Sequence, residues 1–246
     1  MNNIHINHID SSIFELECIY NSHNLHIFMN SLIKTGLIVG GSSNETYTKI
    51  RFKANSVKPF KKYKEEIYHK TKNQGFSINT IANMIHTLTT QLLYLIEQEM
   101  TTIIGYHPSD IIVINDDTFV CINYESMLKI NQYNHNHNKD NQYFSNNFST
   151  ITMPFHTNEI FVSPEQMNIT ELPATLHYKS CYFSFGLFII YALLGNDEFY
   201  QEYLIHKNPQ NIIELFHTHP IKNTKIYWIL SRCLAEEPIN RTILWV

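Results

Sequence analysis

Few residues of this 246-residue chain have types and spacings that suggest chemistry. The glycines of residues 1–57, Gly36, Gly40 and Gly41, lack the G-x-G-x-x-G spacing of a loop that cradles phosphates. The four cysteines are far apart and form no C-x-x-C pair, which predicts buried free thiols and neither a zinc site nor a disulfide framework. His135 and His137 could bind a metal, but two histidines in a polar low-complexity tract fall short of a ligand set.

The charge of the chain limits the classes of molecule that it is expected to bind. It has 18 basic and 22 acidic residues, a formal charge of −4, so no overall field favours nucleic acid or anionic lipid. The short basic run at residues 58–64 is typical of a solvated helix start. The N-terminus lacks the charged-then-apolar pattern of a signal peptide. We therefore expect an intracellular, cytoplasmic protein that binds neither nucleic acid nor membrane.

The first part of the chain carries β-type patterns. Residues 13–20 alternate apolar and polar side chains, turn residues follow, and residues 25–29 then complete a predicted hairpin. Residues 46–53 form a further predicted strand. We expect a small antiparallel sheet here, with no long helix inside it.

Helical spacing dominates afterwards. Residues 58–72 predict a polar surface helix, and an apolar stripe that includes Ile81, Ile85 and Leu88 predicts a helix ending near Glu99. Either Ser77 or Asn79 could accept from its first free N–H groups. Two apolar runs around the turn at residues 115–118 predict a hairpin, and residues 131–148 a low-complexity loop.

The segment from Tyr178 to Gly195 organises the rest. Between Tyr182 and Leu194 it has no charge and is apolar on every side, so it must be buried all round. A bilayer crossing needs about 20 such residues, so we predict a core helix. Further helices are expected at residues 211–217 and 224–235.

Six motifs then appear in a known order. The long helix at residues 81–99 precedes His107-Pro-Ser-Asp-Ile-Ile-Val-Ile, which is similar to K-P-E-N-I-L-I, and a hairpin follows that leads to Asn123-Tyr124-Glu125 in the place of D-F-G. The later matches are Phe161-Val-Ser-Pro-Glu with A-P-E, Lys179-Ser-Cys-Tyr-Phe-Ser-Phe-Gly with K-S-D-V-Y-S-F-G, and Arg232-Cys-Leu-Ala-Glu-Glu-Pro-Ile-Asn-Arg with C-L-x-x-D-P-x-x-R.

These motifs resemble the eukaryotic protein-kinase family. The resemblance implies an α+β, two-lobe fold, with a reduced β-rich N-lobe at residues 1–57 and a helical C-lobe at residues 58–246. A loop like the family's activation segment is expected at residues 123–165.

The resemblance also indicates that the catalytic residues are missing. Gly105 stands where the aspartate of H-R-D would accept the hydroxyl proton, and losing a general base costs about 10²–10⁴ in rate. Asn123 replaces the magnesium-binding aspartate of D-F-G, and an amide oxygen is a poorer Mg²⁺ ligand than a carboxylate. Asp110, at the catalytic-loop asparagine, and Glu125 could bind metal in a rearranged site; alternatively, Asp110 caps its turn and Glu125 is solvated.

Nucleotide binding has little support in the sequence. Lys49 and Lys53 lie on a predicted strand, and either could stand for the family's ATP-contacting strand lysine. The other interpretation is that both are exposed, since no helix supplies a glutamate partner.

Residues that maintain the fold are present. Glu165 and Arg241 stand at the positions of the family's A-P-E glutamate and its late arginine, which form a buried pair. Cys181 replaces the aspartate that holds the catalytic-loop backbone, so we expect that support to be weak or absent because a thiol is a poor acceptor.

The resemblance therefore predicts a pseudokinase, a kinase-like protein without phosphotransfer that has no cofactor. Such a protein would act as a binding or regulatory module for protein partners, whose identity the sequence does not give. The alternative is an atypical ATP-dependent serine/threonine protein kinase with a rearranged active site, which would need ATP and Mg²⁺.

Overall fold

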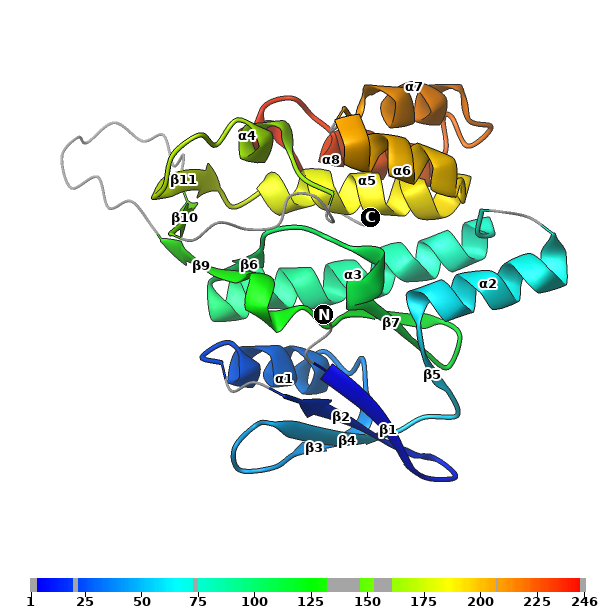
Figure 1. The fold of residues 1–246 in the computed structure, drawn as a ribbon, viewed down its shortest axis with the longest axis vertical. Coiled ribbons are helices and arrows are strands. Elements are labelled where there is room, and N and C mark those ends of the chain that lie inside the picture. The colour runs from blue at the N-terminus through cyan, green and yellow to red at the C-terminus, as the bar shows by residue number, and fades with distance from the viewer. Residues whose placement is uncertain are drawn as a thin grey trace.

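The fold is taken from a computed structural model of the whole chain, which describes residues 4–19, 22–72, 75–131, 147–152, 161–206 and 208–243. Its strands form antiparallel sheets and most of its helices follow the first sheet in the chain, so the predicted α+β class is confirmed. In Figure 1 the first sheet and helix α1 lie on one side of the long helix α3, and helices α5 to α8 lie on the other.

The first sheet has four strands in the order β1-β2-β4-β3, all antiparallel. These are β1 (Ile4–Asp10), β2 (Ile13–Cys18), β3 (Val39–Ser43) and β4 (Lys49–Lys53). The small antiparallel sheet predicted from residues 4–53 is therefore confirmed.

One prediction in this part was wrong. Residues 25–29 are not a strand but the start of helix α1 (Leu25–Lys34), which crosses between β2 and β3. Its buried residues Leu25, Phe28, Met29 and Leu32 follow the i, i+3, i+4, i+7 pattern of a helix that buries one face. A window of five residues was too short to distinguish this period from strand alternation.

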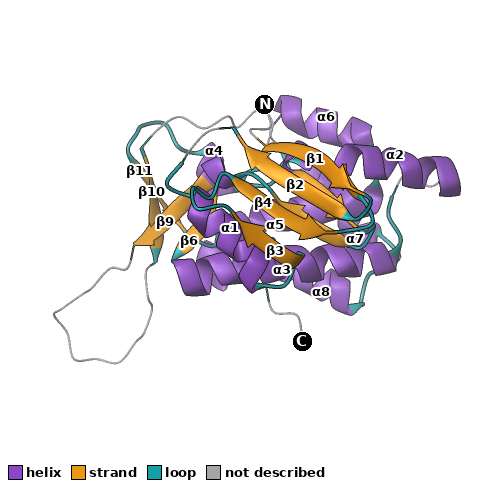
Figure 2. Cartoon of the chain, turned by 90° about the horizontal axis from the view of Figure 1, so that it is seen from below, coloured by secondary structure: helices purple, strands orange, loops and turns teal. Residues whose placement is uncertain are grey.

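Figure 2 shows β1, β2, β4 and β3 side by side in this order. The two faces of the sheet that they form differ in chemistry. Directly paired residues point to the same face of a sheet, so Phe14 with Phe52 and Leu16 with Ile50 make one apolar face, which belongs to the core. The same rule places charged residues on the opposite face, where β2 and β4 pair Glu15 with Arg51, Glu17 with Lys49, and Ile13 with Lys53.

Two further sheets lie beside the helices. One has the order β5-β7-β8, with β5 (Val57–Pro59), β7 (Ile111–Ile114) and β8 (Thr118–Cys121), and the last two form the predicted hairpin. The other has the order β11-β10-β9-β6, with β6 (Thr101–Ile103), β9 (Met127–Asn131), β10 (Phe148–Ile151) and β11 (Ala174–His177). The expected lobe boundary at residues 57 and 58 falls within β5.

The helices follow the sequence pattern closely. They are α2 (Phe60–Thr71), α3 (Ile78–Glu99), α4 (Pro164–Met167), α5 (Ser180–Leu194), α6 (Asp197–His206), α7 (Gln210–Thr218) and α8 (Lys225–Cys233), with short 3-10 turns η1 (Pro108–Asp110), η2 (Tyr124–Ser126) and η3 (Pro238–Asn240). Ser77 caps α3 as predicted, accepting from Thr80 N at 3.2 Å. Helix α6 was not predicted separately.

Helix α5 is the buried core helix expected from the sequence, since every residue from Ser180 to Leu193 is buried. It packs against α3, α7 and α8. Gly75, just before α3, lies very close to the C-terminal end of α5. Any larger residue would not fit there, because a Cβ at this position would lie 2.0 Å from the Leu193 carbonyl oxygen. Among the described residues, no helix is both long and apolar enough to cross a membrane.

A buried amide joins the first sheet's helix to the rest. The Gln91 side chain on α3 pairs with both backbone groups of Cys121, donating to its carbonyl and accepting from its N–H, each at 2.9 Å. Its Nε2 also donates to Ser31 Oγ on α1 at 3.3 Å. Breaking such a group strands buried polar atoms, so α1, α3 and β8 are held as one unit.

Candidate functional site

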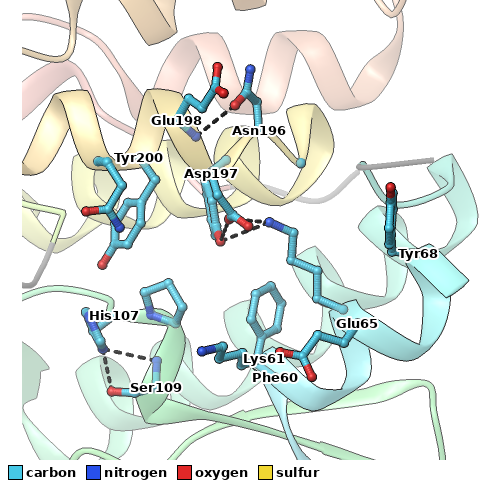
Figure 3. Close-up of a pocket in the computed structure, with 15 residues that line it drawn as sticks. Phe60, Lys61, Glu65, Tyr68, His107, Ser109, Asn196, Asp197, Glu198 and Tyr200 are labelled. Carbon is cyan, nitrogen blue, oxygen red and sulfur yellow. Dashed lines mark hydrogen bonds and ion pairs between the residues drawn. The ribbon is translucent and has the colours of Figure 1, made fainter. Parts of the chain in front are cut away.

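A pocket of about 650 Å³ opens between α2, the turn η1 and the connection from α5 to α6 (Figure 3). Aromatic rings and charged side chains of both signs line it together. Its lining residues include Phe60, Lys61, Lys64, Glu65, Tyr68, His107, Ser109, Tyr191, Asp197, Glu198 and Tyr200. Apolar walls with a few placed polar groups are typical of binding sites.

Local sequence explains how the walls are placed. Phe60, at the start of α2, is buried against the rings of Phe76 and Phe188, 5.5 and 5.3 Å away by ring centroid. On the opposite wall Gly195 ends α5 with φ +68°, a left-handed conformation that glycine adopts without a steric penalty. The Asn196 side chain then accepts from Glu198 N at 2.8 Å, and this contact begins α6.

Lys64 connects the two walls. Its ammonium forms an ion pair with Asp197, donates to Tyr191 OH at 3.1 Å and lies 4.6 Å from the Tyr191 ring centroid. Tyr191 OH also donates to Asp197 Oδ1 at 2.7 Å. Burial raises the pKa of Asp197, but the Lys64 and Tyr191 hydrogen bonds outweigh it and leave that pKa below its usual value. The pocket therefore already holds one cation against an aromatic ring and a carboxylate.

At the other end of the pocket, η1 brings the predicted site residues together. Asn123 Nδ2 donates to Asp110 Oδ2 at 2.7 Å, and Asn123 Oδ1 accepts from Ser126 N at 3.1 Å. The Ser109 hydroxyl lies within hydrogen-bonding distance of His107 Nδ1 and, at 3.4 Å, of Asp110 Oδ1. Burial raises the pKa of the Asp110 carboxyl, although the Asn123 hydrogen bond opposes this.

Gly105 is buried just before this turn. A glycine has no side chain that could act as a general base. Glu125 is exposed on η2, in keeping with its interpretation as a solvated carboxylate. Within the described ranges, no group of three or more His, Cys, Asp or Glu side chains could hold a metal ion. His135 and His137 lie outside those ranges.

Lys49 and Lys53 lie away from the pocket, on the charged face of the first sheet. Lys49 pairs with Glu17 at 2.8 Å and with Glu15 at 3.6 Å, and Lys53 is exposed. Glu15 is nearly fully buried beneath these partners, and the Arg51 hydrogen bond is the main reason that its pKa is lowered, against an opposing effect of burial.

Glu165 and Arg241 form the expected pair. Arg241 is fully buried and binds both carboxylate oxygens of Glu165, with 3.0 Å between its second terminal nitrogen and Oε2. Its other donors reach the carbonyls of Ala235 at 2.8 Å and Glu236 at 2.9 Å. Burial raises the pKa of Glu165, but Arg241 outweighs this and lowers it overall.

Cys181 does not bind the backbone of the loop before η1, as the sequence predicted. Its Sγ donates to Tyr178 O at 3.2 Å and accepts from Thr102 Oγ1 at 3.1 Å, and burial raises the pKa of the thiol to about 12. The loop is nevertheless held. Ser184 Oγ, one helical turn later, accepts from Tyr106 N at 2.8 Å, and Gln166 Nε2 donates to Ile104 O at 2.6 Å. Ser184 and Gln166 therefore support this loop in place of the residue at position 181.

Sequence reasoning missed the Lys64, Tyr191 and Asp197 cluster. Lys64 was treated as one member of a solvated basic run, and Tyr191 as an ordinary core residue. A useful signal was present: a glycine and an asparagine directly before Asp197 mark a helix junction that exposes the next side chain. The contact of Asp197 with Lys64 on α2, however, depends on packing between segments that are far apart in the chain, which a local pattern does not specify. The sequence matches no protein-family model, and no curated protein matches it significantly.

Proposed function

We propose that this chain is a protein-kinase-like module without phosphotransfer activity, a pseudokinase, which acts by binding another protein. The order of elements supports the two-lobe arrangement: a small antiparallel sheet with one helix, a long helix, a turn and hairpin, and a buried central helix. The bidentate pair of Glu165 and Arg241 supports the same assignment, because it joins the two motif positions that the family pairs.

The hydrogen bond from Asn123 to Asp110 carries the functional part of the proposal. These two residues stand at the positions that would bind Mg²⁺ in an active kinase. Here the amide nitrogen of one faces the carboxylate of the other, so the pair is satisfied internally. Glycine at position 105 leaves an attacking hydroxyl without its usual base. The hydrogen bond between Asn123 and Asp110 leaves a metal without its usual ligands.

The first sheet also lacks an arrangement suited to phosphates. Its core face carries Phe14, Leu16, Ile50 and Phe52, and the lysines of β4 are on the other face. A triphosphate needs cationic side chains or free backbone N–H groups against it. The described residues of that face supply no lysine or arginine.

The pocket between α2 and α6 is the binding site that we assign to the partner. It is large enough for one or two side chains of a peptide segment, and its aromatic walls give contact area at low entropic cost. Its exposed carboxylates, Glu65 and Glu198, and its cation Lys61 can set the orientation of that segment.

A nucleotide titration tests the proposal. Thermal unfolding should show no concentration-dependent shift with ATP up to about 5 mM, with or without Mg²⁺ or Mn²⁺, because ligand binding to the folded state alone raises stability. A saturable shift, together with phosphate transfer that disappears in Asp110→Ala, would instead establish the atypical kinase.

Partner binding needs its own test. Proteins captured from the source cells by the wild-type chain should be lost with Glu198→Lys, which changes the pocket wall. They should be retained with Glu97→Lys, which makes the same charge change on α3 outside the pocket. Equal capture by both variants would remove the pocket from the proposal.

A further inference from the structure

Helix α8 presents an unusual outer face. Its inward residues are Ile226, Tyr227, Ile229, Leu230 and Cys233, which are all buried. This fixes the rotation of the helix and forces Trp228 outward, where 53% of its surface is exposed. Large exposed aromatics at fixed positions are enriched among residues that dominate protein–protein binding.

Three cationic residues lie near this tryptophan in the chain. Lys225 is three residues before Trp228 and Arg232 four residues after it, spacings that place all three side chains on one helix face. Lys222 is exposed in the turn that leads into α8. Within the described ranges, neither Lys222 nor Arg232 forms a salt bridge. These three side chains give the face a local concentration of basic residues on a chain whose formal charge is −4.

The base of this face is rigid. Tyr227, next to Trp228, stacks on Phe216 of α7 with ring centroids 4.9 Å apart, and its hydroxyl lies 3.0 Å from His217 Nδ1. The Trp228 ring also meets the Tyr227 ring edge-on at 5.4 Å. A tryptophan held in this way loses little freedom on binding, which favours affinity.

We propose that the outer face of α8, formed by Lys222, Lys225, Trp228 and Arg232, binds an acidic protein segment. The segment packs an apolar side chain on Trp228 and places its carboxylates against the three cations. None of the four residues lines the α2–α6 pocket, so this interface is independent of the function proposed above.

Charge complementarity selects this occupant. Nucleic-acid binding depends on many phosphate contacts and on a positive field, which a chain of formal charge −4 with three clustered cations does not provide. Anionic membranes attract clusters of about four to eight basic residues. One tryptophan flanked by three cations fits a short acidic segment with an apolar anchor.

Tryptophan fluorescence provides the test. The chain has two tryptophans, so a Trp245→Phe background leaves Trp228 as the single tryptophan reporter. The probe is a capped peptide of about 15 residues, made of glutamate and aspartate with leucine at helical spacing. Saturable change in Trp228 emission is expected, and about a tenfold loss of affinity between low and physiological salt.

Charge-matched variants complete the design. Lys222→Glu, Lys225→Glu and Arg232→Glu together should weaken binding at least about tenfold. Lys34→Glu, Lys62→Glu and Lys70→Glu together make the same change of net charge at other exposed positions and should retain binding within about twofold. The proposal is overturned by an unsaturated or absent response at about 1 mM peptide, by equal losses in both triple variants, or by tighter binding of duplex DNA or phosphatidylserine vesicles.

Discussion

The side-chain amide of Asn123 donates a hydrogen bond to the Asp110 carboxylate, with 2.7 Å between Asn123 Nδ2 and Asp110 Oδ2. Asp110 ends the turn η1 and Asn123 caps the turn η2, so this hydrogen bond joins the two turns. Burial makes ionised Asp110 unfavourable, and this one hydrogen bond only partly compensates. The ionised form of the Asp110 carboxyl therefore lowers the stability of the folded chain.

This relationship predicts that Asp110→Asn stabilises the protein at neutral pH. Because the pKa of Asp110 is raised in the folded state, the folded chain binds the proton more tightly than the unfolded chain. Stability contributed by this group is lost as pH rises from about 4 through the folded pKa, so the variant should gain most at about pH 7 and little at about pH 3. Urea unfolding at both pH values measures this. A variant that is less stable than wild type at pH 7 contradicts it.

The pair of Glu165 and Arg241 gives the opposite pH dependence. Arg241→Met should destabilise the fold by about 3–5 kcal/mol, since it strands a partly buried carboxylate. The pKa of Glu165 is lowered in the folded state, so its contribution is present above the unfolded value and lost as pH falls through the folded one.

The matched variant here is Arg232→Met, which removes an exposed arginine and should change stability by less than about 0.5 kcal/mol. Denaturant unfolding at about pH 7 and about pH 3 should show a large difference between the two variants at the higher pH and a smaller one at the lower. Equal effects at both pH values would show that packing, and not the ion pair, explains the loss.

The sequence predicted most of this fold where period and length were unambiguous. The long apolar stripe through Ile81 and Leu88 predicts a helix with one buried face, and α3 is such a helix. The uniformly apolar segment from Tyr182 to Leu194 predicts a helix that is buried all round, and α5 is such a helix. Helix α1 was missed because its pattern begins with five residues that fit a strand equally well.

Strands β9, β10 and β11 were also missed. Each depends on pairing with a segment distant in sequence, as Ser149 does with Ile130 and Leu176. Local pattern does not specify such partners. The same limit applies to the pocket, where Lys64 on α2 meets Asp197 on α6 although the two residues are far apart in the chain.

Ser184 should be more important to the fold than Cys181. Ser184→Ala would leave Tyr106 N–H and the Phe161 carbonyl without their buried partner, at a cost of about 1–3 kcal/mol. Cys181→Ser keeps the contacts with Thr102 and Tyr178 and is the control, with an expected cost below about 1 kcal/mol. Thermal unfolding ranks the two variants. If Cys181→Ser proved the more damaging, Ser184 would not be the residue that holds this loop.

Lys64→Met should separate stability from partner binding. The variant removes the ammonium that joins α2 to Asp197 but keeps the apolar stem beside Tyr191. Because Asp197 is largely exposed, the ion pair is screened, and we expect a loss of at most about 1 kcal/mol in unfolding free energy. The freed Asp197 and Tyr191 then offer an open cation site, so affinity for the captured partner should change about tenfold or more.

A double-mutant cycle with Asp197→Asn measures the coupling directly, since the two single changes should be non-additive in binding if Lys64 acts through Asp197. Lys62→Met, on the same helix but outside the pocket, is the matched control and should leave partner affinity unchanged. Loss of several kcal/mol of stability in Lys64→Met, with no specific effect on binding, would instead assign the lysine to the fold alone.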